Sequence, residues 1–306
     1  MGTFDGKVAF ITGIARAQGR SHALRLASGG ADIIGVDIVE DIPGLHYHLA
    51  SQHDLQETIE LIERTGRRAI VRPADVRDLD SLTRVVNDGV ADLGGLDIVV
   101  ANAGIFSLGA ATELSDRAWQ DVLDVNLTGA WDTAKATVPH IAAGGRGGSI
   151  IFVSSMAALR PPLGLAHYSA SKAGVVALMK TLAAELGPQF IRVNTVNPAT
   201  VDTPMIDNDT ILGAFMPELE HPTRDDAAKP DSGFVRINAL PVPWLQDRSV
   251  WRSGPSISVW SGSTEKRRLL VVTSFLRCPV QRGVPRGRRR PAVGRGSRAT
   301  RRLCCP

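Results

Sequence analysis

The chain has 306 residues, 43% of them hydrophobic, enough to bury the core of one large domain or two small ones. Its net charge of +4 is uneven, because residues 247–306 carry +13 and residues 1–246 carry −9, and all three cysteines lie in that basic segment. The body lacks cysteine, a signal peptide and an apolar run of bilayer length, which excludes disulfide scaffolds and membrane proteins and predicts a cytoplasmic protein.

Short apolar runs alternate with stretches of helical periodicity over the first 200 residues. Strands are predicted at 7–12, 31–37, 69–74, 96–101, 149–154 and 191–196, and helices at 21–27, 55–63, 79–93, 116–140 and about 168–186. Apolar strands that alternate with amphipathic helices predict a parallel sheet covered on both faces. The predicted fold class is therefore a Rossmann-type, doubly wound α/β fold with three layers, α/β/α.

Several residues that can bind ligands or do chemistry lie at the carboxyl ends of predicted strands. They are Gly13, Asp37, Asp75, Asn102, Ser155 and Pro198. Ligands of doubly wound sheets bind at the carboxyl ends of the strands. We therefore expect these residues to line one crevice.

The turn after the first strand runs from Thr12 to Gly19, and glycine there lets backbone amides approach a pyrophosphate at the start of a helix. An ordinary strand-to-helix turn is the alternative. The next strand ends in Asp37, whose carboxylate can accept hydrogen bonds from both ribose hydroxyls of NAD and would repel the extra phosphate of NADP. Arg16 points the other way, but the repulsion by Asp37 acts directly on the 2'-position, so NAD is the predicted cofactor.

Tyr168 and Lys172 are spaced for acid/base chemistry, with Ser155 upstream. Residues four apart share one face of a helix, so we expect the ammonium to lower the phenol's pKa from its usual value of about 10. Surface helices also carry such pairs by chance. Asn126 lies within a predicted helix, where a polar amide either makes a kink, contacts a ligand or faces solvent.

Other motifs have ordinary structural alternatives. Residues 102–104 could be a strand-ending turn, and residues 75–76 could cap the following helix. The histidines of the connection 38–54 lack the spacing of a zinc site, and adjacent terminal cysteines have poor geometry for a tetrahedral one. We therefore predict no metal site.

Taken in order, these motifs resemble the short-chain dehydrogenase/reductase family over residues 5 to about 204. The resemblance implies Tyr168 as the general acid/base, Lys172 as its pKa-lowering partner and ribose ligand, and Ser155 as the donor that orients the substrate oxygen. It implies Asn126 as the anchor of a water-mediated proton relay. The implied cofactor-binding residues are Gly13, Arg16, Gln18, Gly19, Asp37, Asp75, Val76, Asn102, Ala103, Gly104, Tyr168, Lys172, Pro198, Val201 and Thr203.

Finer features resemble the actinobacterial, carveol-dehydrogenase-like and mycofactocin-associated members of the family. These features are residues 19–27, the long connection 38–54 and residues 239–244. The subgroup resemblance implies a tightly held NAD and secondary-alcohol substrates. Ala17 departs from the pattern because the family usually has a glycine there, and its methyl group either crowds the phosphate or only shifts the loop.

Residues 246–306 are rich in Arg, Ser, Pro and Gly and lack amphipathic periodicity. We therefore predict a domain over residues 1–245, with its substrate loop at about 199–245, and an atypical tail. An out-of-frame translation, a disordered extension and a polyanion-binding tail are the open interpretations. The family's final helix and strand have no counterpart in this pattern, which predicts an unpaired edge beside strand 191–196; residues 267–277 could pair there, but we do not assign them to the sheet.

The sequence thus predicts an NAD-dependent alcohol dehydrogenase or carbonyl reductase that acts on a small alcohol or ketone, with neither a nucleic acid nor a membrane as partner. The resemblance also implies a homo-tetramer if the carboxyl end permits one. Two alternatives remain. One is a 3-oxoacyl-ACP or 3-oxoacyl-CoA reductase, recognised by activity with thioesters and NADPH. The other is a catalytically impaired protein that binds NAD or polyanions.

Overall fold

The structure is a computed structural model, and it describes residues 2–227, 229 and 271–273. All of them belong to one compact unit of the chain, Met1–Leu276. The predicted domain boundary at residue 245, the 239–244 motif and nearly all of the basic tail lie outside the described residues.

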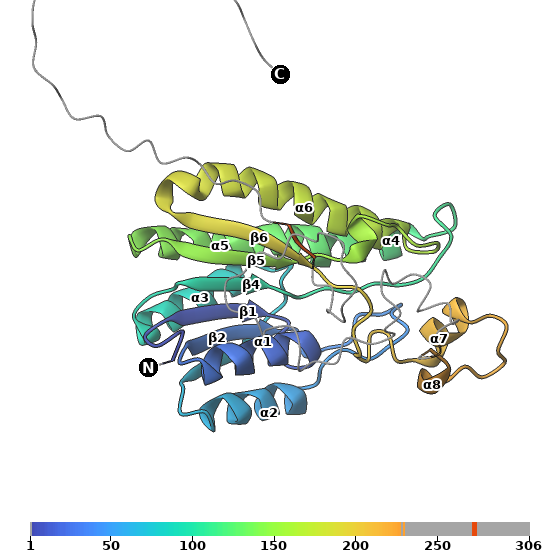
Figure 1. The fold of residues 1–306 in the computed structure, drawn as a ribbon, viewed down its shortest axis with the longest axis horizontal. Helices are drawn as coiled ribbons and strands as arrows, with labels where there is room; N and C mark the ends of the chain where they lie inside the picture. Colours follow the sequence, from blue (N-terminus) through green and yellow to red (C-terminus); the bar gives the residue numbers. More distant parts are fainter. Residues whose placement is uncertain (1, 228, 230–270, 274–306) are drawn as a thin grey trace, which may run out of the picture. The chain divides into compact units, whose positions relative to one another are not determined.

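A seven-stranded sheet forms the centre of this unit, in the order β3-β2-β1-β4-β5-β6-β7 (Figure 1). The strands are β1 (Val8–Thr12), β2 (Asp32–Asp37), β3 (Ala69–Pro73), β4 (Ile98–Ala101), β5 (Gly148–Val153), β6 (Ile191–Asn197) and β7 (Val271–Thr273). The first six pair in parallel, and each matches a predicted strand to within two residues at either end. The Rossmann-type fold class is therefore confirmed.

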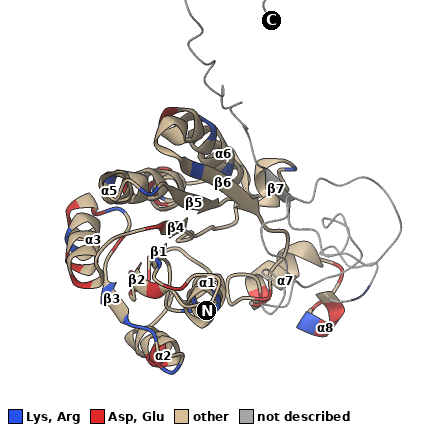
Figure 2. Cartoon of the chain, turned by 60° about the vertical axis from the view of Figure 1, so that its left-hand side comes forward, with Lys and Arg blue, Asp and Glu red and all other residues tan. Residues whose placement is uncertain are grey.

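The helices are α1 (Ala17–Ser28), α2 (Gln52–Glu63), α3 (Leu79–Leu93), α4 (Asp116–Leu123), α5 (Gly129–Ala143), α6 (Ala166–Leu186), α7 (Asp209–Phe215) and α8 (Arg224–Ala227). Short 3-10 turns are η2 (Met156–Ala158) and η3 (Gly187–Gln189). Ser51 caps α2 with a reciprocal capping box, which explains why α2 begins three residues before the predicted helix. Lysine, arginine, aspartate and glutamate lie mainly on the helices around the sheet (Figure 2).

Two apolar layers cover the two faces of the sheet. Phe10 of β1 packs in the layer that includes residues of α3, α5 and α6. The next residue, Ile11, packs in the layer that includes residues of α1 and α2. Successive side chains of a strand point to opposite faces, so burial on both sides explains why β1 reads as a continuous apolar run.

The helix predicted over 116–140 is interrupted. Between α4 and α5 the backbone forms a π-helical turn, η1 (Asp124–Thr128), and Asn126 lies within it. Such wide turns inside helices are often found at functional sites. Of the three interpretations of Asn126, the kink is the one that the backbone adopts.

The edge beyond β6 differs from the sequence expectation. β7 pairs antiparallel with β6, with Val272 opposite Val196. The prediction of an unpaired edge is therefore wrong for these three residues of β7. Val-Val-Thr is β-branched throughout and suits a strand, and the edge of β6 offers backbone groups to pair with.

Candidate active site

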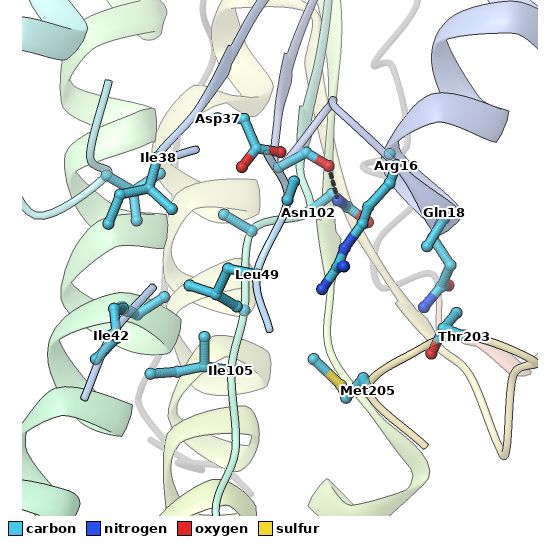
Figure 3. Close-up of a pocket in the computed structure, with 18 of the residues that line it drawn as sticks. Arg16, Gln18, Asp37, Ile38, Ile42, Leu49, Asn102, Ile105, Thr203 and Met205 are labelled. Atoms are coloured by element: carbon cyan, nitrogen blue, oxygen red, sulfur yellow. Dashed lines mark hydrogen bonds between the residues drawn. The ribbon is translucent and has the colours of Figure 1, made fainter. Parts of the chain in front are cut away.

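A pocket lies at the carboxyl ends of β1, β2, β3 and β4 (Figure 3). Eleven of the predicted cofactor-binding residues line it, namely Gly13, Arg16, Gln18, Gly19, Asp37, Asp75, Val76, Asn102, Ala103, Gly104 and Thr203. Tyr168, Lys172, Pro198 and Val201 do not. The carboxyl ends of the parallel strands place Gly13, Asp37, Asp75 and Asn102 in this pocket, as expected for this fold, whereas the other two residues of the expected crevice, Ser155 and Pro198, do not line it.

Sequence reasoning missed the apolar wall of the pocket. The additional lining residues are Ala17, Ile38, Ile42, Tyr47, Leu49, Ala50, Ala74, Ile105, Val125, Pro204 and Met205. Figure 3 shows Ile38 and Ile42 toward one end of the pocket and Gln18 and Thr203 toward the other. The unusual length of the connection 38–54 was the available signal, but it has no periodicity from which the inward-facing residues could be read.

The first turn is packed too closely for side chains at its glycines. A Cβ on Gly19 would lie 1.8 Å from the carbonyl oxygen of Gly13, and Gly13 itself has a φ of +65°. The amide of Asn102 donates to the carbonyls of Thr12 and Gly13 at 3.0 and 3.1 Å. Asn102 therefore does more than end a strand, because it fixes the shape of the turn.

Ala17 has a φ of +48°, in the left-handed region that favours glycine. It also lines the pocket. The departure from the family pattern noted in the sequence thus falls at a residue whose backbone conformation is the one that a glycine would adopt without strain.

Asp37 is buried, and its Oδ2 accepts a hydrogen bond from the backbone amide of Ala15 at 2.9 Å. Burial raises the pKa of Asp37, while backbone amides and Arg16 act in the opposite direction. The guanidinium of Arg16 donates to the carbonyl of His48 in the connection 38–54. Arg16 therefore holds that connection, and both Arg16 and Asp37 line the pocket.

Asp75 does not cap α3, so the structural alternative for residues 75–76 is wrong. The cap is Asp78, whose side chain accepts from the amide of Ser81 at 3.0 Å. The carboxylate of Asp75 instead accepts from Arg77 at 2.8 and 2.6 Å, which fixes Asp75 at the edge of the pocket.

The predicted catalytic side chains meet at the start of α6. Tyr168 and Ser155 share a side-chain hydrogen bond. The Nζ atom of Lys172 lies 5.7 Å from the ring centroid of Tyr168 and donates to the carbonyl of Val153 at 2.9 Å. The carbonyl of Pro198 accepts from the amide of Met156 at 2.9 Å, which ties the end of β6 to the turn that carries Ser155.

The protonation of this pair differs from the sequence expectation. Burial raises the pKa of Tyr168, although the hydrogen bond with Ser155 acts to lower it. Burial also lowers the pKa of Lys172 to about 8. Burial disfavours the charged form of each group, and it is the largest cause of both shifts.

Asn126 is almost completely buried, at 1% exposure, so the solvent-facing interpretation is wrong. Its Oδ1 accepts from the amide of Ile105 at 2.8 Å, and its Nδ2 donates to the carbonyl of Ile105 at 2.9 Å and to Ser171 Oγ at 3.1 Å. Ser171 Oγ in turn donates to the carbonyl of Tyr168 at 2.7 Å. Asn126 thereby connects the π-helical turn to the helix that carries Tyr168.

Gly104 joins the pocket to the catalytic group. A Cβ at this position would lie 3.1 Å from Lys172 Nζ and 3.2 Å from Asn126 Oδ1. Gly104 also lines the pocket, although Lys172 does not. The pocket and the catalytic side chains are therefore adjacent parts of one site.

Tyr168 also borders a separate apolar cluster. Its buried members are Phe106, Leu165, Ile211, Leu212, Met216 and Ala227, and Tyr168 and Met205 pack against it. The α7 residues in this cluster come from the predicted substrate loop. The surroundings of Tyr168 on this side are therefore hydrocarbon.

Within the described part of the chain, no three or more His, Cys, Asp or Glu side chains are grouped in a way that could hold a metal ion. The helices described there include none that is both long and apolar enough to cross a membrane.

Comparisons with known proteins show the family to which the chain is similar. Residues 7–210 match the short chain dehydrogenase family. The chain is 49% identical over 251 residues to (-)-trans-carveol dehydrogenase of Rhodococcus erythropolis, which covers 82% of this chain and 90% of that protein.

Two solved structures are also similar. A carveol dehydrogenase from Mycobacterium avium in complex with NAD has 46% identity and a TM-score of 0.77, over 81% of this chain and 88% of that one. A short chain dehydrogenase from Mycobacterium paratuberculosis bound to NAD has 45% identity and a TM-score of 0.71, over 80% and 88%.

Proposed function

This chain belongs to the short-chain dehydrogenase family, and from that premise we propose that it is an NAD-dependent oxidoreductase that interconverts a secondary alcohol and a ketone. The observation that carries the proposal is the juxtaposition at Gly104 of the pocket with Lys172 and Asn126. The NAD-bound carveol dehydrogenase of Mycobacterium avium supports the choice of cofactor and of substrate class.

The shape of the first turn suits a dinucleotide. Gly19 leaves no room for a Cβ, and Gly13 has a positive φ, where a Cβ would have close neighbours at 3.0 Å. Such a turn lets backbone amides reach a pyrophosphate at the start of α1. Asp37 would hold the adenosine ribose, since one carboxylate oxygen already orients the turn through Ala15 and the residue lines the pocket. NAD supplies the chemistry of hydride transfer.

The proton is handled by the side chains of the chain. As the alcohol is oxidised, the ionised form of Tyr168 takes the proton of the substrate hydroxyl onto Oη, and in the reverse direction the neutral phenol returns that proton to the ketone oxygen. Ser155 donates to the same oxygen and orients it. The ammonium of Lys172 places positive charge beside the phenol. Asn126 connects the π-helical turn to α6 through its hydrogen bond to Ser171.

The apolar cluster beside Tyr168 supports a hydrocarbon-rich alcohol as substrate. Burying hydrocarbon there is favourable, whereas a charged carrier would lose hydration without a partner among the cluster residues. Arg16, the residue that would have favoured NADP, donates to the carbonyl of His48. This bond engages one nitrogen of a side chain that also lines the pocket, so the preference between NAD and NADP is decided by measurement.

The experiment is to follow reduction of NAD or NADP with a panel of cyclic and linear secondary alcohols, and oxidation of NADH or NADPH with ketones and 3-oxoacyl thioesters. Wild type should turn over the apolar alcohols with NAD, and Tyr168→Phe should lose activity while still binding NAD. Activity confined to acyl thioesters with NADPH would support the reductase alternative. Bound NAD without turnover of any alcohol or ketone would support the catalytically impaired protein.

A homo-oligomer is a further part of the proposal. Trp119 of α4 and Trp131 of α5 are 38% and 46% exposed, which is unusual for large apolar side chains and typical of a surface that contacts a partner. Light scattering during size-exclusion chromatography should give the mass of a multimer, and a monomeric mass would contradict this part.

A further inference from the structure

The segment Ile105–Ser107, which we call the strap, is held by side chains from three separate parts of the chain. Asn126 of η1 binds both backbone groups of Ile105. The hydroxyl of Tyr47 accepts from the amide of Phe106 at 3.2 Å. Ser107 Oγ and His167 Nε2 lie 2.9 Å apart, within hydrogen-bond distance. Three consecutive residues are therefore fixed at once.

The middle residue of the strap lies between the two tyrosines of the chain. The ring centroid of Phe106 is 6.1 Å from that of Tyr47 and 5.5 Å from that of Tyr168, with interplanar angles of 43° and 57°. Tilted rings at such distances attract each other. Phe106 is 3% exposed, so its ring has little freedom to move away from Tyr168.

Tyr47 reaches the strap from the connection 38–54 and also lines the pocket. Tyr47 therefore lies in the proposed cofactor site and also contacts Phe106, whose ring packs against Tyr168. His167, the neighbour of Tyr168 in sequence, holds the other end of the strap and is completely buried. Burial lowers the pKa of His167, so its ring is neutral near pH 7 and can share one hydrogen with the Ser107 hydroxyl.

We propose that Tyr47 is a positioning residue, whose hydroxyl fixes the main chain of Phe106 and thereby holds the Phe106 ring against Tyr168. The proposal rests on the proposed function for the identity of the proton-transfer group. The proposal has one consequence: a substitution at Tyr47 in the pocket wall changes the position of the Tyr168 ring through Phe106.

The competing explanation is that Tyr47 only fills the wall of the pocket. In that case its ring matters and its hydroxyl does not. Tyr47→Phe separates the two, because it keeps the ring and leaves the buried amide of Phe106 without its acceptor, which is unfavourable. His46→Ala is the matched control, since His46 is exposed and adjacent in sequence.

The test combines kinetics with a signal from Tyr168 itself. The chain has only two tyrosines, so protein labelled with 13C at tyrosine Cζ gives two resonances, and the one that remains in Tyr47→Phe belongs to Tyr168. We expect Tyr47→Phe to shift that resonance and to lower kcat about 10-fold, because small misplacements of reacting groups are costly. The Kd for NAD should change less than about 3-fold.

The pH dependence adds an independent readout. Burial raises the pKa of Tyr168, so a loosened strap that admits water should move the apparent pKa in the kcat profile downward. His167→Gln loosens the same strap from its other end and should shift the Tyr168 resonance too. His46→Ala should change neither the resonance nor kcat.

Two results would overturn the proposal. One is a Tyr168 resonance that is the same in wild type, Tyr47→Phe and His167→Gln. The other is a loss in Tyr47→Phe that lies entirely in the Kd for NAD with kcat unchanged. If wild type turns over no alcohol, the proposed function fails, but the resonance still decides whether Tyr47 positions Tyr168.

Discussion

The Nζ atom of Lys172 lies 5.7 Å from the ring centroid of Tyr168 and donates to the carbonyl of Val153 at 2.9 Å. The side chain is 3% exposed, and burial lowers its pKa from the usual value of 10.5 to about 8. The unfolded chain therefore holds this proton more tightly than the folded chain. The charged lysine thus costs stability.

We therefore expect Lys172→Met to abolish turnover and to stabilise the fold. The loss of folding stability caused by this charge is complete below pH 8, where Lys172 is protonated in the folded and the unfolded chain. It disappears as the pH rises through 10.5, where Lys172 is neutral in both. Its upper limit is about 3 kcal/mol, from about 1.4 kcal/mol per pKa unit, reduced by the lost hydrogen bond to Val153. Urea unfolding between pH 7 and 10.5 measures it, and a stability difference that does not shrink with pH would contradict the assignment.

Ala17→Gly should strengthen both the fold and cofactor binding. A residue with a Cβ at φ +48° is strained by about 1 kcal/mol, part of which is offset by the greater freedom of glycine in the unfolded chain. The same change removes a methyl group from the pocket wall, so the Kd for NAD should fall. Thermal unfolding and NAD titration check this.

The matched control for Ala17→Gly is Ala23→Gly in the same helix. Ala23 is completely buried and inside α1, so glycine there should destabilise the fold by about 1 kcal/mol. If Ala17→Gly destabilises the fold as Ala23→Gly does, the backbone at Ala17 is not strained, and the prediction is wrong.

Gly104→Ala should disable the site without unfolding the protein. The new methyl group would lie 3.1 Å from Lys172 Nζ and 3.2 Å from Asn126 Oδ1, so at least one of them must move. We expect kcat to fall up to about 100-fold with circular dichroism unchanged. Gly187→Ala is the control, because nothing lies within 4 Å of its Cβ, and equal activity of the two variants would count against the juxtaposition.

Asp37→Asn should weaken the preference for NAD over NADP. Asparagine keeps an oxygen for the amide of Ala15 but loses the charge that repels a 2'-phosphate. We expect the Kd for NADP divided by the Kd for NAD to fall about 10-fold, as measured by calorimetric titration. Asp41→Asn removes an exposed charge from the nearby connection and should leave the ratio unchanged. An unaltered ratio in Asp37→Asn would refute the role of the carboxylate.

The candidate site was largely predictable where the fold does the assembling. Gly13, Asp37, Asp75 and Asn102 each follow an apolar run, and parallel strands place their carboxyl ends together whatever the details of packing. The four-residue spacing of Tyr168 and Lys172 likewise follows from helix geometry alone. These inferences depend on local periodicity, which a single sequence contains.

The pKa shifts of Tyr168 and Lys172 could not be predicted from local periodicity. The spacing predicted that Lys172 lowers the pKa of Tyr168, whereas burial raises that pKa and lowers the pKa of Lys172. Burial depends on which helices and loops cover a residue. It therefore emerges only when the whole domain is assembled.

The sequence by itself determined the order of strands and helices and the place of Gly13, Asp37, Asp75 and Asn102 at the carboxyl ends of the strands, and it predicted Ser155, Tyr168 and Lys172 as candidate catalytic residues. Only the tertiary structure decided that Asn126 lies in a buried π-helical turn and that Tyr47 bonds Phe106, 59 residues away. The physical reason is the separation along the sequence of the residues that interact. Periodicity arises from neighbours within a turn or a strand, whereas the contacts of Asn126 and Tyr47 exist only because separate segments pack against the same edge of the sheet.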